Sequence, residues 1–113
     1  MTMGDRQEQN AKNEATFRDM NEWTREANDA LPGKEGQLES YLCECSDRLC
    51  TEPISMTRVE YEAVRSEPIR FAIVLNHENP EIDKVVLENE RFATVEKFYG
   101  VGARVARETD PRR

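Results

Sequence analysis

The sequence is short of apolar residues, and this shortage excludes several classes of protein. Only 37% of its 113 residues are hydrophobic, and the longest apolar run extends from Phe71 to Leu75. A membrane-spanning helix needs about 20 apolar residues, and residues 1–10 contain no apolar core of a signal sequence. We therefore expect a cytoplasmic protein without a membrane segment, with a small core that a bound metal would help to stabilise.

Basic residues are outnumbered by acidic ones. The chain has 16 Lys and Arg against 23 Asp and Glu, which gives a formal net charge of −7. Phosphate backbones repel such a chain unless it carries a local basic face. No run of Lys or Arg forms one, since Glu108 and Asp110 dilute the arginines of the tail. Binding of nucleic acid is therefore not expected.

The signatures of common catalytic sites are missing as well. The sequence contains no P-loop, no dinucleotide fingerprint and no G-x-S-x-G motif. His77 and Glu78 resemble the start of an H-E-x-x-H metalloprotease helix, but the second histidine is absent and Pro80 would interrupt the helix. The zinc deaminase signature is absent too. We therefore expect that the protein is not an enzyme.

What the sequence does contain is a succession of short strands and helices. Periodicity predicts, in order, a helix at 12–31, strands at 38–45 and 52–55, a helix at 57–67, and strands at 70–75, 85–87 and 92–98. A last helical turn is expected at 103–108, before Pro111. Thr57 followed by Glu60 is a capping-box pattern that marks the start of the second helix. These elements predict an α+β fold with an N-terminal helix, one small, mostly antiparallel sheet of four or five strands, and one packed helix.

The expected domain organisation follows from the same pattern. Residues 1–10 are predicted to be disordered, 11–36 to form the N-terminal helix and a linker, 37–103 to form a zinc-binding α+β domain, and 104–113 to be a tail. On the second helix, Val59, Ala63, Tyr61 and Val64 are expected to face inward, and Arg65 to lie on the surface.

The N-terminal helix carries a narrow apolar stripe. Met20, Trp23, Ala27 and Ala30 recur at three- and four-residue steps, and Phe17 flanks them. Such a thin stripe needs a surface to lie on. It either docks the helix on its own domain or binds another chain. Our prediction for a partner-binding surface is Phe17, Met20 and Trp23, and a homodimer through this helix is an open alternative.

All three cysteines of the chain lie in a C-x-C-x4-C segment, and the single histidine follows later. Cys43, Cys45, Cys50 and His77, here called the cysteine–histidine cluster, form a recognised tetrahedral ligand set for zinc. Clustered thiols in a reducing compartment indicate metal or redox chemistry more than disulfides. A strand–helix–strand path would return His77 to the cysteine hairpin, so that zinc would join the hairpin to a loop.

Other interpretations of the cluster stay open. The cysteines could be buried apolar residues, redox thiols, or ligands of an iron centre instead of zinc. Glu44, Glu52 and Glu78 lie beside the predicted ligands. Each could be a general base next to a metal-bound water, but we expect solvated carboxylates or groups that support the ligands, because four protein ligands leave no open position on the metal.

From about Tyr41 to Lys97 the chain resembles a group of short, uncharacterised proteins of actinobacterial type. Their pattern is approximately F-x-C-E-C-x4-C-T-E, a helix L-x-x-E-Y-E-x-V-R, then Pro, R-F and a G-H-E-x-P turn. The matching segments are Cys43-Glu44-Cys45, Cys50-Thr51-Glu52, Glu60–Arg65, Arg70-Phe71, His77-Glu78-Asn79-Pro80 and Val95-Glu96-Lys97. This chain has Asn76 where the group has Gly. The resemblance implies that His77 is the fourth ligand, and it carries no established function.

The functional hypothesis is a non-catalytic, zinc-stabilised interaction or regulatory module that binds a protein partner. A thiol-based redox sensor or small metal-dependent enzyme is the second hypothesis. A zinc-ribbon-like module that binds nucleic acid is the third, and the net charge of −7 argues against it.

Overall fold

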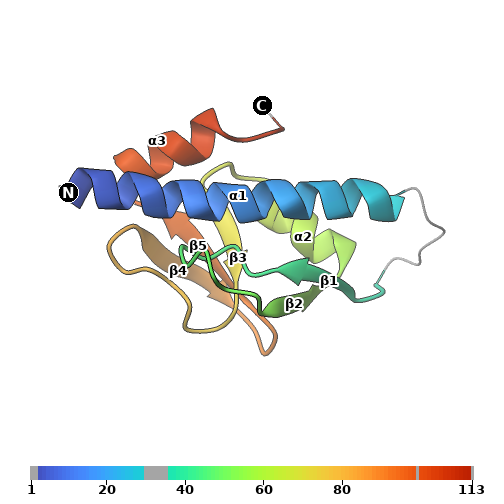
Figure 1. Cartoon of the computed structure of the whole chain (residues 1–113). Coiled ribbons are helices and arrows are strands. Elements are labelled where there is room, and N and C mark those ends of the chain that lie inside the picture. Colours follow the sequence, from blue (N-terminus) through green and yellow to red (C-terminus); the bar gives the residue numbers. More distant parts are fainter. Residues whose placement is uncertain (1–2, 30–35, 99, 113) are drawn as a thin grey trace.

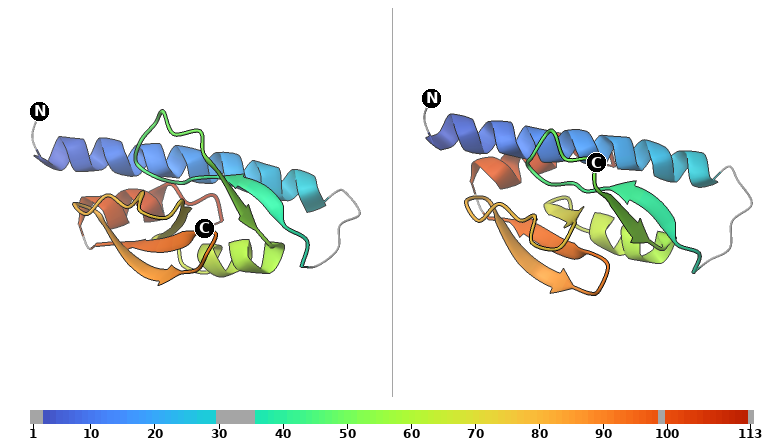
Figure 2. Two further views of the ribbon diagram at one scale, coloured as in Figure 1. Left: turned by 90° about the horizontal axis from the view of Figure 1, so that it is seen from below. Right: turned by 60° about the horizontal axis from the view of Figure 1, so that its bottom comes forward.

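The longest element is the helix α1, Met3–Asp29, which runs along the length of the molecule (Figures 1 and 2). The structure is a computed structural model that describes residues 3–29, 36–98 and 100–112. Residues 3–10 are helical, so the prediction that this segment is disordered is wrong for them. Of the predicted linker, only Gly36 is among the described residues.

Two small antiparallel sheets lie on one side of α1 (Figure 1). The strands are β1 (Glu39–Leu42), β2 (Pro53–Met56), β3 (Arg70–Ile73), β4 (Asp83–Glu88) and β5 (Ala93–Lys97). β1 pairs with β2, and the other three form a sheet in the order β3-β5-β4. The α+β class and all five predicted strands are confirmed, but the strands form two sheets where we expected one.

The second helix, α2 (Arg58–Arg65), begins at the predicted capping box. The Thr57 hydroxyl accepts a hydrogen bond from the backbone N–H of Glu60 at 3.1 Å, and the Glu60 carboxylate accepts one from the N–H of Thr57 at 2.9 Å. Two N–H groups that the first turn leaves without helical partners are thereby satisfied.

The inward face of α2 differs in part from the prediction. Tyr61 and Val64 are buried, and the Tyr61 ring stacks on that of Tyr41 with centroids 4.6 Å apart. Val59, however, is 66% exposed, and Ala63 is exposed as well. The buried side of α2 therefore consists of Tyr61, Val64 and Arg65, and Tyr61 contacts Tyr41 of the hairpin.

The chain ends in a third helix, α3 (Val101–Glu108), which packs against α1. This helix confirms the helical turn expected at 103–108, so the predicted tail 104–113 is mostly structured. Arg65 on α2 is buried, contrary to its predicted surface position, because it forms ion pairs with Asp110 after α3 and with Glu22 on α1, the latter at 2.5 Å. Arg112 also pairs with Glu22, at 2.6 Å. These contacts fasten the C-terminal segment to the two helices.

The helix α1 docks through a face that consists largely of polar residues. Its fully or nearly buried residues recur at helical spacing and are Ala11, Glu14, Ala15, Arg18, Asn21 and Glu22. The predicted apolar stripe instead faces solvent, since Met20 is 50% exposed, Trp23 is 77% exposed and Ala27 is exposed. Ala30 lies outside the described residues. The stripe therefore does not attach the helix to its own domain.

Each buried polar residue of α1 has a defined partner on the domain. The Arg18 guanidinium donates to the carbonyls of Pro68 at 2.7 Å and Ala106 at 2.8 Å, and it lies 4.6 Å from the centroid of the Phe71 ring. The Asn21 amide accepts from the backbone N–H of Leu42 at 2.8 Å and donates to its carbonyl at 2.9 Å. These bonds offset the desolvation of the buried groups.

Candidate metal centre

The hairpin of β1 and β2 brings the three cysteines together. The register pairs Leu42 with Pro53, and just beyond it the N–H of Cys43 donates to the carbonyl of Glu52 at 3.2 Å. The connecting loop is closed by Asp47, whose carboxylate accepts from the N–H of Leu49 at 2.9 Å and whose carbonyl accepts from the N–H of Cys50 at 3.0 Å. An aspartate favours such a turn, which returns Cys50 beside the end of β1.

His77 reaches the hairpin through the turn that follows β3. The N–H of His77 donates to the carbonyl of Val74 at 3.0 Å, and Asn76 has a φ angle of 71°. This left-handed conformation is one that Gly and Asn adopt more readily than other residues, which accounts for an asparagine at this position. The N–H of Val74 also donates to Cys43 Sγ at 3.1 Å, so the turn and the hairpin are directly joined.

The geometry of the cysteine–histidine cluster fits a single metal ion. Its four ligand atoms all lie within 4.8 Å of one another. His77 Nδ1 is 3.5 Å from Cys43 Sγ and 3.8 Å from Cys50 Sγ. A tetrahedron with Zn–S bonds of about 2.3 Å and Zn–N bonds of about 2.0 Å has edges of roughly 3.5 to 3.8 Å between ligands. The prediction that these four residues converge, made from the sequence, is confirmed by this arrangement.

The pKa values of the Cys43 and Cys45 thiols are shifted in opposite directions, because the two groups form a hydrogen bond with each other. The hydrogen bond with Cys43 lowers the pKa of Cys45 to about 5, and the same bond, together with burial, raises the pKa of Cys43. Cys45 Sγ also lies 3.9 Å from the carbonyl of Asp47. Because thiolates are the form that binds metal, a cation in the cluster would displace these protons.

Glu52 orients the histidine. Its Oε2 atom is 2.8 Å from His77 Nε2, while Nδ1 of the same ring faces the thiols. A carboxylate that accepts from one ring nitrogen fixes the tautomer and directs the lone pair of the other nitrogen toward the metal. This contact confirms, for Glu52, the expectation that a glutamate beside the predicted ligands supports one of them. That the supported ligand is His77 could not be predicted, because the two residues lie on different loops.

Glu44, between two of the ligands, points away from the cluster. It is fully buried, and its carboxylate accepts from the Asn21 side chain at 2.8 Å and from the N–H of Ala72 at 3.0 Å. Burial raises its pKa to about 7. Glu44 is therefore neither a solvated carboxylate nor a base beside the cluster. Its hydrogen bonds connect the chain after β1 to α1 and to β3. Glu78 is half-buried, and its Oε1 atom has no hydrogen-bond partner among the described residues.

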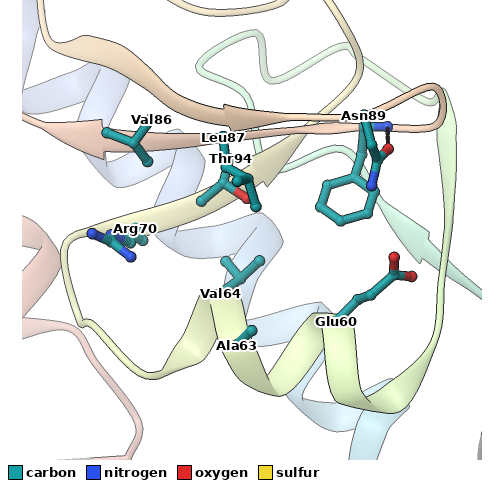
Figure 3. Close-up of a pocket in the computed structure, with 9 residues that line it drawn as sticks. Glu60, Ala63, Val64, Arg70, Val86, Leu87, Asn89 and Thr94 are labelled. Carbon is teal, nitrogen blue, oxygen red and sulfur yellow. Dashed lines mark hydrogen bonds between the residues drawn. The ribbon is translucent and has the colours of Figure 1, made fainter.

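The described part of the chain also contains a small apolar cavity that is separate from the cluster. Its volume is about 240 Å³, and it lies between α2 and the sheet of β3, β5 and β4 (Figure 3). Val86 and Leu87 both line it, although successive residues of a regular strand face opposite sides. A β-bulge between Val85 and Leu87 causes this arrangement. No cysteine or histidine lines the cavity.

The residues predicted to bind a partner lie on α1. Met20 and Trp23 are on its solvent-facing side, and Phe17 is half-buried at the margin of that side.

In the segments that the structure describes, no helix combines the length and the apolar character needed to cross a membrane.

Within the cluster, four protein ligands would complete a tetrahedral metal site, which is the arrangement of structural sites and leaves no position for a reactive water. Soft thiolates with one imidazole suit zinc and also iron.

Comparison with protein-family models, with characterised protein sequences and with solved structures yields no match to this chain.

Proposed function

We propose that this protein is a non-catalytic, zinc-stabilised interaction module that acts by binding a protein partner. The observation that carries the proposal is the closed ligand set of the cysteine–histidine cluster, with its four ligand atoms within 4.8 Å of one another and with Glu52 already engaged at the outer nitrogen of His77. A site of this kind stabilises a fold and performs no chemistry of its own.

The position of the cluster supports a structural role for the metal. The ion would join the end of β1, the start of β2 and the turn after β3, which belong to two different sheets. A chain in which 37% of the residues are hydrophobic has little apolar surface to hold such segments together. Metal binding would supply part of the folding free energy, as in other small metal-stabilised domains.

The test is elemental analysis of the purified protein, combined with a thiol titration before and after chelation. We expect about one zinc per chain and thiols that react only once the metal is removed. Substitution by cobalt would give the absorption of a tetrahedral thiolate complex. Cys45→Ser should abolish stoichiometric binding, whereas Leu49→Ala should not, since Leu49 is in the same loop and 77% exposed. Iron in place of zinc would refute the identity of the metal and leave the site.

A thiol-based redox sensor is the second candidate, and the proximity of three thiols, with Cys50 only half-buried, favours it. The titration separates the two functions. Absence of metal together with three freely reactive thiols would refute the zinc module and support the sensor.

A further inference from the structure

The polarity of α1 is inverted relative to an ordinary surface helix. The face against the domain includes Glu14, Arg18, Asn21 and Glu22, whereas the solvent side presents an apolar stripe. We define the outer face of α1 as the exposed residues Thr16, Met20, Trp23 and Ala27. They follow one another at steps of four, three and four residues, which aligns them along one side of a helix.

The intramolecular contacts of α1 do not account for this stripe. Trp23, the single tryptophan of the chain, is 77% exposed, and Met20 is 50% exposed. Isolated exposed apolar residues are common. An aligned row with a tryptophan at its centre is, by contrast, typical of the side of a helix that packs against another helix. A second helix laid along α1 would bury this row.

The charges beside the stripe select the partner. Asp19 and Glu26 lie four residues before and three residues after Trp23, so both flank the indole on the helix surface. Among the described residues, neither carboxylate forms an ion pair with a Lys or Arg side chain. Arg18 and Arg65 attract Asp19 only from beyond ion-pair distance, and both are buried on the inner side. The complementary surface is therefore apolar at its centre and basic beside it. A lysine or arginine of that surface could also stack on Trp23.

The same charges disfavour a second copy of this chain on the outer face. Two copies packed through Trp23 would bring their Asp19 and Glu26 rows together, and like charges at close range oppose association. The net charge of −7 adds to this repulsion.

We propose that the outer face of α1 binds an amphipathic helix of a partner protein that presents apolar residues flanked by Lys or Arg. Trp23 is the anchor, Met20 and Ala27 extend the apolar contact, and Asp19 and Glu26 set the charge preference. This inference rests on the proposed function, because it names the chemistry of the partner that the module binds.

The experiment uses the full-length, metal-saturated protein and two designed helical peptides with the same pattern of leucines. One peptide carries Lys at its polar positions and the other carries Glu. Binding is measured by the anisotropy of a fluorescein label on the peptide, and by the emission of Trp23, which no other tryptophan obscures. We expect binding of the Leu/Lys peptide, with a blue shift of the Trp23 emission, and no measurable binding of the Leu/Glu peptide.

Matched variants locate the contact. Trp23→Ala should weaken binding of the Leu/Lys peptide at least tenfold, whereas Val59→Ala, which removes a 66% exposed side chain on α2, should leave it unchanged. The pair Asp19→Asn and Glu26→Gln should weaken binding several-fold at low salt and flatten its salt dependence. Glu90→Gln, at an exposed position in the β4–β5 turn, is the control.

Several results would overturn the proposal. These are equal binding of both peptides, no binding of the Leu/Lys peptide, or binding that Trp23→Ala does not weaken. If the protein dimerises with rising concentration and Trp23→Ala abolishes this, the outer face binds a second copy of the chain. If phosphatidylcholine vesicles shift the Trp23 emission to the blue, the outer face binds a lipid surface. Metal content is measured on the same samples, so that failure of peptide binding by fully loaded protein rejects the α1 surface and leaves the metal site standing.

Discussion

Replacement of Lys97 by Met tests the ionic contact that seats α1 on the three-stranded sheet. The Lys97 ammonium lies between the carboxylates of Glu14 on α1 and Asp83 on β4, and all three side chains are fully buried. The ammonium is also 5.0 Å from the centroid of the Phe71 ring. Methionine retains an unbranched apolar chain of similar length and removes the ammonium group, with its charge and its N–H donors.

The expected loss of stability is large. Removal of one partner of a buried ion pair costs about 3 to 5 kcal/mol, because the remaining charge is left without compensation. Here one ammonium serves two carboxylates, so we expect Lys97→Met to lie near the upper end of that range. This is a large part of the roughly 5 to 15 kcal/mol that stabilises a typical domain. Glu14→Gln, by contrast, leaves Asp83 and Lys97 as a single pair and should cost about 1 kcal/mol.

The pH dependence of the loss provides an independent check. Burial raises the pKa of Asp83 to about 7 and lowers that of Lys97 to about 6. The contact between the two groups favours the charged form of each, because opposite charges attract. In Lys97→Met no cation opposes the shift of Asp83. Because its pKa in the folded state is then above the value in the unfolded state, stability is retained at about pH 4 and is lost as the pH rises through 7. The deficit of the variant should therefore be larger at pH 8 than at pH 5.

The assay is urea denaturation of the metal-saturated protein followed by circular dichroism, at pH 5 and pH 8. Lys84→Met removes a lysine from an exposed position on β4 and should change stability by less than about 0.5 kcal/mol. A loss below about 1 kcal/mol for Lys97→Met at pH 8 would refute the reasoning, as would a deficit that grows on acidification.

Three further changes should each weaken one connection of the fold or site. Glu52→Gln loosens the orientation of His77 and should lower metal affinity about 10- to 100-fold, measured by competition with a chromogenic chelator; an unchanged affinity would contradict that role. Asn21→Ala removes both bonds to the backbone of Leu42 and should cost about 2 to 3 kcal/mol in urea denaturation, with exposed Thr16→Ala as the control. Thr57→Ala removes the α2 cap and should cost about 1 kcal/mol in the same assay; a loss below 0.3 kcal/mol would count against it.

Local signals in the sequence were sufficient for the strands and for α2. The cap at Thr57 and the alternation around β1 and β5 depend on neighbours a few residues away, and these patterns predict structure well. The convergence of His77 with the cysteines could be predicted because the chain offers one histidine and because the thiols need a fourth ligand.

The docking face of α1 could not be predicted, since hydrophobic periodicity assigns an apolar stripe to the interior. In this chain the interior partners of α1 are themselves polar or charged. Lys97 lies far along the sequence from Glu14, and Arg65 lies far from Glu22. No local pattern distinguishes a glutamate that will meet a buried lysine from one that will face water.

The polar docking face and the exposed apolar stripe are two consequences of one arrangement. A small set of apolar residues forms the core between the sheets, α2 and α3. The helix α1 is held on this core by ion pairs and by hydrogen bonds of its Arg18 and Asn21 side chains. Buried polar contacts of this kind add little net stability, yet they strongly disfavour alternative registers, because a helix shifted by one turn would leave Glu14, Arg18 and Glu22 without partners. The helix is thereby fixed in one rotation. In this orientation Trp23 points outward from a helix that is already fixed on the domain. Binding of a partner would then cost less conformational entropy than binding to a mobile segment.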